Sequence, residues 1–200
     1  MWIKICGMTT PEAVAAAVDA GADAIGFVFA KSPRRLTPRA AAELARPARG
    51  QVRCVAVTRH PAQSLVEEIF QVLAPDILQT DAADLEALHL PAALERLPVL
   101  RAGAALPPSL PARVLFEGPV SGSGVAGDWE AARSLARRTE LVLAGGLTAT
   151  NVAAAIARVR PFGVDVSSGV ETRPGVKSPA AIVEFVAAAR AAAPSQEDSA

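Results

Sequence analysis

Short runs of β-branched and apolar residues alternate with longer Ala- and Leu-rich stretches of helical period along most of the chain. The runs that predict strands read WIKIC, DAIGFVF, VRCVAVT, DILQT, PVLRAG, RVLFEG, LVLAGG and FGVDVSS. Helices are expected between and after them, beginning near Pro11, Pro38, Pro61, Ala82, Asp128, Thr148 and Ser178. Strands that alternate with helices form parallel βαβ units. Because no Gly/Ser-rich linker divides the chain, the pattern predicts a single (β/α)8 TIM barrel over residues 1–192 and a polar, frayed tail at 193–200.

One connection departs from this alternation. The stretch AALPPSLPA follows the fifth strand and is too rich in proline for a good helix, so we expect a short or irregular connection.

An open, doubly wound sheet is the structural alternative to the barrel. It would ordinarily carry a G-x-G-x-x-G loop after its first strand, whereas the corresponding segment here reads CGMTTPEA. The barrel is therefore favoured.

The composition excludes several classes of protein. Twenty basic side chains balance twenty acidic ones, so no net field attracts nucleic acid or an anionic membrane. The apolar runs are too short or too interrupted to span a membrane, and no secretory signal pattern opens the chain. The two cysteines, Cys6 and Cys54, and the two histidines, His60 and His89, lack the spacing of metal ligands. These features predict a cytoplasmic protein that needs no metal or cofactor.

The first strand places a thiol where a barrel has its active site, at the carboxyl ends of the strands. Side chains alternate along a strand, and Ile3 and Ile5 suit the helix layer. Lys4 and Cys6 therefore point into the barrel, with Cys6 at its mouth. Cysteine is usually an inert core residue, and that interpretation stays open for Cys6 at this point.

The eighth strand turns Asp165 and Ser167 inward by the same alternation. Strands one and eight are neighbours in a closed barrel, so Lys4 and Asp165 could form an ion pair inside it. A buried pair is weak support for function on its own. Ionisable groups with perturbed environments nevertheless cluster at active sites, so both a structural role and contact with a substrate stay open.

Two further polar residues end strands on the inward face. Glu117 ends RVLFEG across the barrel from Cys6, and Gln79 follows DIL at the end of the fourth strand. A carboxylic acid opposite a thiol suits an isomerase, in which one group donates a proton while the other removes one. The alternative for Glu117 is an ordinary solvated loop carboxylate.

Glycine-rich turns follow the seventh and eighth strands, where barrels usually bind phosphate. The first turn contains Gly145 and Gly146, and the second contains Ser168 and Gly169. Backbone N–H groups at such turns form an anion site without a lysine. A third glycine-rich loop, SGSGVAGDW, could cover the site or add a phosphate contact.

The loop after the second strand reads FAKSPRRLTP and contains three basic residues, Lys31, Arg34 and Arg35. A guanidinium can bind a carboxylate through two parallel hydrogen bonds, so this loop could recognise an anionic group of a substrate. A simple solvated loop is the alternative.

The segments KICGMT, GADAIGFVFAKSPRRLTP, LAGGLTATNV and VDVSSGVETRPGVKSP resemble phosphoribosylanthranilate isomerase, in order and over nearly the whole chain. The resemblance implies a (β/α)8 barrel without metal or cofactor that acts on a small phosphorylated substrate, as a monomer or homodimer. It implies the Amadori rearrangement of N-(5-phosphoribosyl)anthranilate to 1-(2-carboxyphenylamino)-1-deoxyribulose 5-phosphate in tryptophan biosynthesis.

The resemblance also assigns roles to individual residues. It makes Cys6 the general base, Arg35 the contact for the anthranilate carboxylate, and Asp165 a further residue of the catalytic site. Lys4 and Gln79 join Arg35 in binding the substrate. The phosphate then falls on the turns already described, which contain Gly145, Gly146, Ser168 and Gly169.

Two positions depart from the family pattern. Glu117 stands where the family usually has an aspartate as general acid, and Asp81 stands where it usually has a histidine. The alternatives are another phosphosugar isomerase or synthase on this fold, and a non-catalytic barrel that binds phosphosugars. Retention of Cys6 and Arg35 argues against the non-catalytic barrel.

Overall fold

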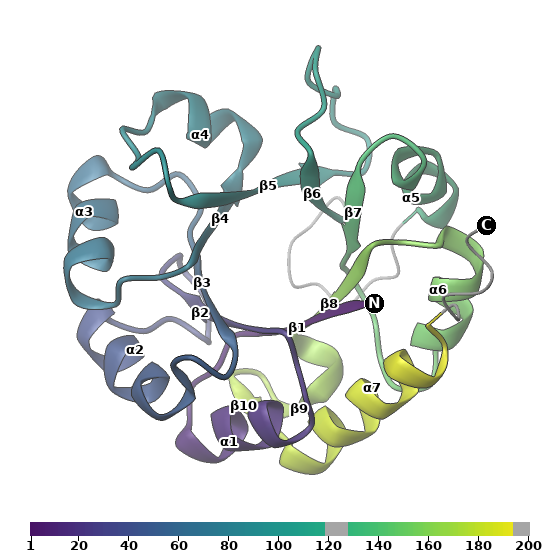
Figure 1. Cartoon of the computed structure of the whole chain (residues 1–200), viewed down its shortest axis with the longest axis horizontal. Coiled ribbons are helices and arrows are strands. Elements are labelled where there is room, and N and C mark those ends of the chain that lie inside the picture. The colour runs from purple at the N-terminus through teal and green to yellow at the C-terminus, as the bar shows by residue number, and fades with distance from the viewer. Residues whose placement is uncertain (119–127, 194–200) are drawn as a thin grey trace.

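The computed structural model describes residues 1–118 and 128–193 and shows a closed barrel of parallel strands surrounded by helices (Figure 1). Consecutive strands pair with one another, and β1 pairs with β8 to close the barrel. The strands of the barrel are β1 (Trp2–Cys6), β2 (Ala24–Val28), β3 (Arg53–Val57), β4 (Ile77–Asp81), β5 (Glu95–Arg101), β6 (Arg113–Glu117), β7 (Glu140–Leu143) and β8 (Gly163–Val166). The predicted TIM barrel is confirmed.

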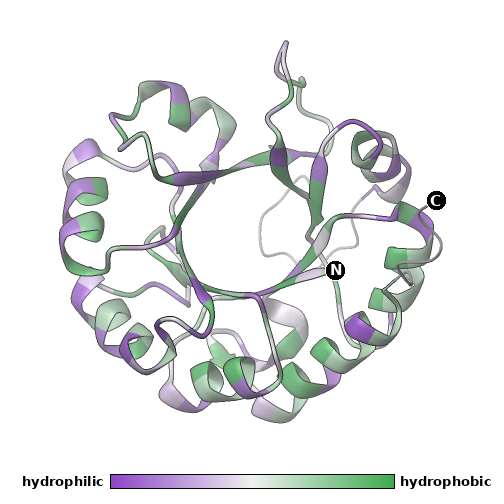
Figure 2. Ribbon diagram, in the orientation of Figure 1, coloured by the Kyte–Doolittle hydropathy of each residue, from purple (hydrophilic) through white to green (hydrophobic). Residues whose placement is uncertain are grey.

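The helices lie outside the barrel. They are α1 (Pro11–Asp19), α2 (Pro38–Ala45), α3 (Gln63–Val72), α4 (Ala82–Ala87), α5 (Trp129–Ala136), α6 (Val152–Val159) and α7 (Pro179–Ala191). Figure 2 shows that the helices carry both hydrophobic and hydrophilic residues, as expected when only one face of a helix packs on the barrel. A short 3-10 helix, Arg46–Ala48, follows α2.

Several helices begin where the sequence predicts. Thr10, Thr37 and Ser178 accept hydrogen bonds from backbone N–H groups at the starts of α1, α2 and α7, and a proline occupies the first turn of each. Asp128 caps α5 through hydrogen bonds of 3.0 Å from the N–H groups of Glu130 and Ala131. Helices α3 and α6 begin slightly later than predicted.

The strand alternation predicted from the sequence is also confirmed. Ile3 and Ile5 belong to the apolar layer between the strands and the helices. A second, smaller cluster fills the barrel interior and includes Leu115, two positions before Glu117 on β6. The other buried members of that cluster are Ala24, Val55, Ile77, Leu97, Val99, Val142 and Ala144.

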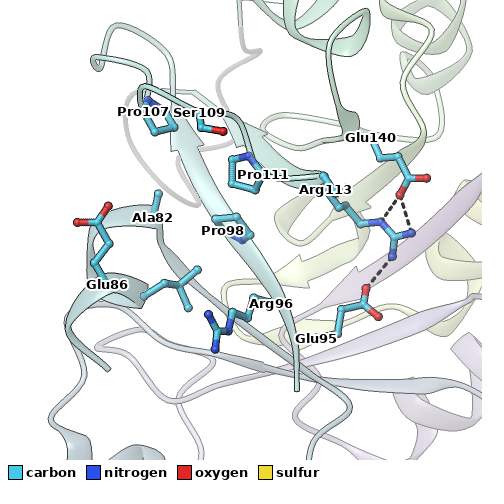
Figure 3. Close-up of a pocket in the computed structure, with 12 residues that line it drawn as sticks. Ala82, Glu86, Glu95, Arg96, Pro98, Pro107, Ser109, Pro111, Arg113 and Glu140 are labelled. Carbon is cyan, nitrogen blue, oxygen red and sulfur yellow. Dashed lines mark hydrogen bonds and ion pairs between the residues drawn. The ribbon is translucent and has the colours of Figure 1, made fainter. Parts of the chain in front are cut away.

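The connection between β5 and β6 contains no helix, as its prolines predict. A cavity of about 590 Å³ lies on the outer wall there, bounded by Pro98, Pro107 and Pro111 (Figure 3). Arg113 crosses its edge and binds both Glu95 and Glu140.

A hairpin that the sequence pattern does not predict is inserted between β8 and α7. A 3-10 turn (Ser168–Val170) leads into β9 (Glu171–Arg173), which pairs antiparallel with β10 (Val176–Lys177). Most of the SGSGVAGDW loop and of the 193–200 tail lies outside the described residues. No helix within residues 1–118 and 128–193 is both long and apolar enough to cross a membrane.

Candidate active site

A cavity of about 210 Å³ opens at the carboxyl ends of the strands. It brings together four residues that the sequence predicts for the site, Cys6, Gln79, Glu117 and Asp165. They come from β1, β4, β6 and β8, on different sides of the barrel. The larger cavity on the outer wall (Figure 3) contains no cysteine, and three of its charged side chains bind one another. The mouth of the barrel is therefore the candidate active site.

Lys4 and Asp165 form an ion pair beneath this cavity. They are register neighbours across the β1–β8 seam, and Lys4 Nζ lies 2.7 Å from Asp165 Oδ1. The Lys4 side chain is fully buried. Burial alone would lower the pKa of Lys4, but the carboxylate of Asp165 and the sulfur of Cys6 together raise it. The predicted pair is confirmed, and Lys4 lies below the cavity lining rather than in it.

Cys6 ends β1 with its side chain buried against Lys4. Gly26 on the neighbouring strand leaves room for both, because a Cβ there would lie 3.2 Å from Cys6 Sγ and from Lys4 Cε. Burial raises the pKa of the Cys6 thiol. The charges of Lys4 and Lys177 act in the opposite direction and do not fully offset the burial. The burial of Cys6 thus favours its neutral thiol over the thiolate.

Glu117 ends β6 beside a chain of charged residues at the rim. Arg101 Nη2 lies 3.0 Å from Glu117 Oε1, and Arg101 Nη1 also donates to Asp81 at the end of β4. One guanidinium thus binds two carboxylates from the two neighbouring strands. Asp81 occupies the position where the resemblance implies a histidine, and in this chain it fixes Arg101 next to Glu117.

Gln79 contributes a buried polar side chain to the cavity wall. Its side chain is buried, and its Oε1 accepts no hydrogen bond from any residue that the structure describes. Leaving such an oxygen unpaired costs about 1–3 kcal/mol. A substrate N–H or O–H in the cavity would satisfy it.

The basic loop places its two neighbouring arginines differently. Arg34 lines the cavity, whereas Arg35, the residue predicted to bind the substrate carboxylate, is exposed and lies outside the lining. The loop makes a tight turn in which the N–H of Arg35 donates to the carbonyl of Ser32, so the two arginines project differently. Gly7 makes room for Arg34, because a Cβ at Gly7 would lie 2.5 Å from Arg34 Cδ.

Arg34 binds Glu171 on the inserted hairpin through two parallel hydrogen bonds. Its Nε and Nη2 lie 2.7 and 2.8 Å from the two carboxylate oxygens. This contact raises the pKa of Arg34. Burial alone would raise the pKa of Glu171, but Arg34 and Lys177 together lower it. Sequence reasoning missed Glu171 and Lys177, although the PGVK segment contains the lysine.

The predicted phosphate turns lie at the same end of the barrel, on adjacent loops. Gly145 and Gly146 have φ angles of 93° and 65°, which favour glycine. Asn151 fastens this turn by donating to the carbonyl of Gly146 at 2.8 Å. The turn after β8 touches it, since a Cβ at Gly169 would lie 1.9 Å from the carbonyl oxygen of Leu147. These residues adjoin the cavity through Ser167 but are not part of its lining.

Among the described residues, one group could bring three ligand atoms to a metal ion. It consists of His60, Asp81 and Asp84, whose ligand atoms lie within 4.8 Å of one another. Hydrogen bonds from other residues of the protein already bind both of these carboxylates. Asp84 accepts from the backbone and ring of His60 and from Thr80, and Asp81 binds Arg101. A nearby guanidinium repels a cation, so the cluster does not fit a metal.

Comparisons with known proteins agree with this site. The family model described as N-(5'-phosphoribosyl)anthranilate (PRA) isomerase matches residues 3–188. The N-(5'-phosphoribosyl)anthranilate isomerase of Rhizobium etli is 41% identical over an alignment of 202 positions, which spans 92% of this chain and 91% of the relative.

Solved structures give the same result. The structure of TrpF from Jonesia denitrificans matches with a TM-score of 0.82 and 35% identity, over 96% of this chain and 98% of that one. A phosphoribosylanthranilate isomerase in complex with reduced 1-(o-carboxyphenylamino)-1-deoxyribulose 5-phosphate matches with a TM-score of 0.74 and 29% identity, over 96% and 99% of the two chains. The chain described here belongs to the phosphoribosylanthranilate isomerase family.

Proposed function

We propose that the cavity at the barrel mouth converts N-(5-phosphoribosyl)anthranilate into 1-(2-carboxyphenylamino)-1-deoxyribulose 5-phosphate, in tryptophan biosynthesis. The proposal rests on one observation above all: Cys6 and Glu117 line the same cavity from β1 and β6. A thiol and a carboxylic acid on different sides of a substrate can remove one proton and supply another, which is what an aldose–ketose isomerisation requires.

Glu117 acts first, as the general acid. It protonates the ring oxygen of the furanose, and the C1–O bond breaks to leave an iminium ion conjugated with the anthranilate ring. The ring oxygen becomes the hydroxyl group on C4. Arg101 and Asp81 hold the Glu117 carboxyl in place at the end of β6. The longer glutamate reaches further into the cavity than the aspartate usual in the family.

Cys6 acts second, as the general base. Its thiolate removes the proton from C2 of the sugar, and the resulting enol tautomerises to the ketone. The raised pKa of Cys6 leaves only a small thiolate fraction at neutral pH. The positive iminium beside C2 acidifies that proton, and the Lys4 and Lys177 charges favour the thiolate as it forms. Asp165 keeps Lys4 in position at 2.7 Å.

The remaining residues bind the two ends of the substrate. Arg34 takes the role that the sequence analysis gives to Arg35 and binds the anthranilate carboxylate. Gln79 Oε1 accepts a hydrogen bond from the substrate, which satisfies its buried oxygen. The phosphate binds to backbone N–H groups of the turns at Gly145–Gly146 and Ser168–Gly169.

Complementation tests this proposal. The gene should restore growth without tryptophan to a bacterial strain that lacks the isomerase step, and the Cys6→Ser variant should not. Failure of the wild-type gene, with soluble protein present in the cells, would favour a non-catalytic barrel that binds phosphosugars.

A further inference from the structure

The inserted hairpin returns a lysine to the barrel mouth. Lys177 on β10 has a fully buried side chain, and its Nζ donates to Glu171 Oε1 at 2.9 Å and to the carbonyl of Ser167 at 2.9 Å. Ser167 Oγ lies 3.3 Å from the same Nζ and donates to the carbonyl of Cys6. Lys177 thus ties the hairpin to Ser167, and the Ser167 hydroxyl binds the end of β1, where the candidate base lies.

Glu171 connects this lysine to the substrate cavity. Both of its carboxylate oxygens accept from Arg34, and only 11% of the Arg34 side chain and 5% of the Glu171 side chain are exposed. The Nε–Nη2 edge of the guanidinium is therefore taken by Glu171. Its Nη1 has no acceptor among the residues that the structure describes, and Arg34 lines the cavity.

The backbone around Arg34 is held by the same hairpin. Gly175, at the hairpin turn with φ of 84°, packs so closely on the Arg34 loop that a Cβ there would lie 2.7 Å from the carbonyl oxygen of Pro33. Thr9 Oγ1 donates to the carbonyl of Gly175 at 2.7 Å. The loops after β1, β2 and β8 therefore form one packed unit, and Arg34 has little freedom to move.

The charges of this unit suit an anionic ligand. Arg34 and Glu171 alone would be neutral together, and the buried Lys177 gives the three side chains one net positive charge. Buried charges bound by short hydrogen bonds in fixed geometry are stronger than exposed pairs. A guanidinium held on one edge presents its other edge to a carboxylate without a further loss of side-chain entropy.

We propose that Glu171 and Lys177 are positioning residues that hold Arg34 for the carboxylate of the aromatic ring, so that the hairpin determines selectivity for a carboxylated arylamine. The inference rests on the proposed function, since it concerns the substrate of the same site. Glu171 and Lys177 act through Arg34 and do not themselves need to touch the substrate.

The test compares two substrates that differ only in this carboxylate, N-(5-phosphoribosyl)anthranilate and N-(5-phosphoribosyl)aniline. The wild type should have a much higher kcat/KM for the first. Arg34→Met should remove most of that preference. Glu171→Gln and Lys177→Met should lower the preference at least about tenfold, because misplacement of about 1 Å can cost about a hundredfold in rate. For Glu171→Gln the kcat/KM for the aniline substrate should change by less than about threefold, because Glu171 does not contact the reacting atoms. Lys177→Met should lower it for both substrates, since the Lys177 charge also favours the Cys6 thiolate, and should lower it further for the anthranilate substrate.

Glu140→Gln is the matched control, because Glu140 also accepts two contacts from one arginine, Arg113, but on the outer wall. It should leave the preference unchanged. If Glu171→Gln fails to fold, Glu171→Asp keeps the charge and withdraws the carboxylate, and it should lower the preference in the same way.

The outcomes separate the two proposals. A wild type that turns over neither substrate contradicts the proposed function. A wild type that prefers the anthranilate substrate, with folded Glu171 and Lys177 variants that keep the full preference, contradicts the positioning role alone. Equal losses on both substrates in Glu171→Gln would mean that the hairpin is only structural, which also contradicts it.

Discussion

Lys4 and Asp165 lie opposite each other where the first and last strands meet, and their side chains form an ion pair of 2.7 Å inside the barrel. The pair joins the two ends of the sheet and places a cation beside the Cys6 thiol. Closure of the fold and the environment of the proposed base therefore depend on the same contact.

Removal of the Lys4 charge should weaken both the closure of the barrel and the environment of Cys6. Lys4→Met leaves the Asp165 carboxylate buried without its partner, which typically costs about 3–5 kcal/mol. Denaturant unfolding should show this loss, and Lys4→Met/Asp165→Asn should recover part of it because no uncompensated charge remains. A double variant less stable than Lys4→Met would contradict this account of the pair.

The pH dependence of catalysis should reflect the raised pKa of Cys6. Burial keeps the thiol protonated beyond its ordinary value of about 8.5, and the thiolate is the active form. In the Glu117→Gln variant, whose residual kcat/KM no longer requires a protonated acid, kcat/KM should therefore still be rising with pH between about 7 and 9. Alkylation of Cys6 by iodoacetamide, followed in the Cys54→Ser variant, should rise over the same range. Alkylation that is already maximal at about pH 7 would contradict the assignment.

The phosphate turn can be tested at Gly146. Valine there should raise KM more than it lowers kcat, because a phosphate that does not react contributes largely uniform binding. Inorganic phosphate should compete with the substrate for the wild type and more weakly for Gly146→Val. Gly50→Val is the control for backbone strain, since Gly50 has a similar φ of 78° in open space. An unchanged KM in a folded Gly146→Val protein would place the phosphate elsewhere.

The acid can be tested at Glu117. Glu117→Gln removes the proton and keeps the shape, so kcat should fall about 10²–10⁴-fold and the limb of the pH profile that requires the protonated acid should disappear. Asp128→Asn should leave kcat unchanged and lower stability by less than about 1 kcal/mol, because asparagine also caps α5 well. An active Glu117→Gln beside an inactive Asp128→Asn would reverse the assignment.

Glu117→Asp tests the length of the acid. The aspartate shortens the side chain by one C–C bond and withdraws the carboxyl from Arg101. A large loss of kcat would indicate that the Arg101–Asp81 pair is matched to the longer acid. Activity near that of the wild type would indicate that the site tolerates either length.

Much of this arrangement follows from local patterns in the sequence. Alternation along β1 separates Ile3 and Ile5 from Lys4 and Cys6, and parallel strands that close must bring Lys4 near Asp165. The prolines of AALPPSLPA likewise exclude a helix between β5 and β6. Such features depend on residue period and backbone chemistry, which a sequence displays directly.

The features that the sequence did not predict depend on loop conformation and on contacts distant along the chain. Neighbouring Arg34 and Arg35 are chemically equivalent in the sequence, and only the turn and the space at Gly7 decide which one faces the cavity. The contact between Arg34 and Glu171 spans 137 positions. Lys177 belongs to a hairpin too short to show a strand period.

The most direct test of the central claim is turnover of N-(5-phosphoribosyl)anthranilate by the purified protein in the presence of a chelator. The wild type should convert it to 1-(2-carboxyphenylamino)-1-deoxyribulose 5-phosphate. Cys6→Ser should keep the fold and lose activity about 10²–10⁴-fold, while Cys54→Ser, at the other cysteine, should change it little. Binding of the substrate without conversion by the wild type, or equal losses from the two cysteine variants, would contradict the account.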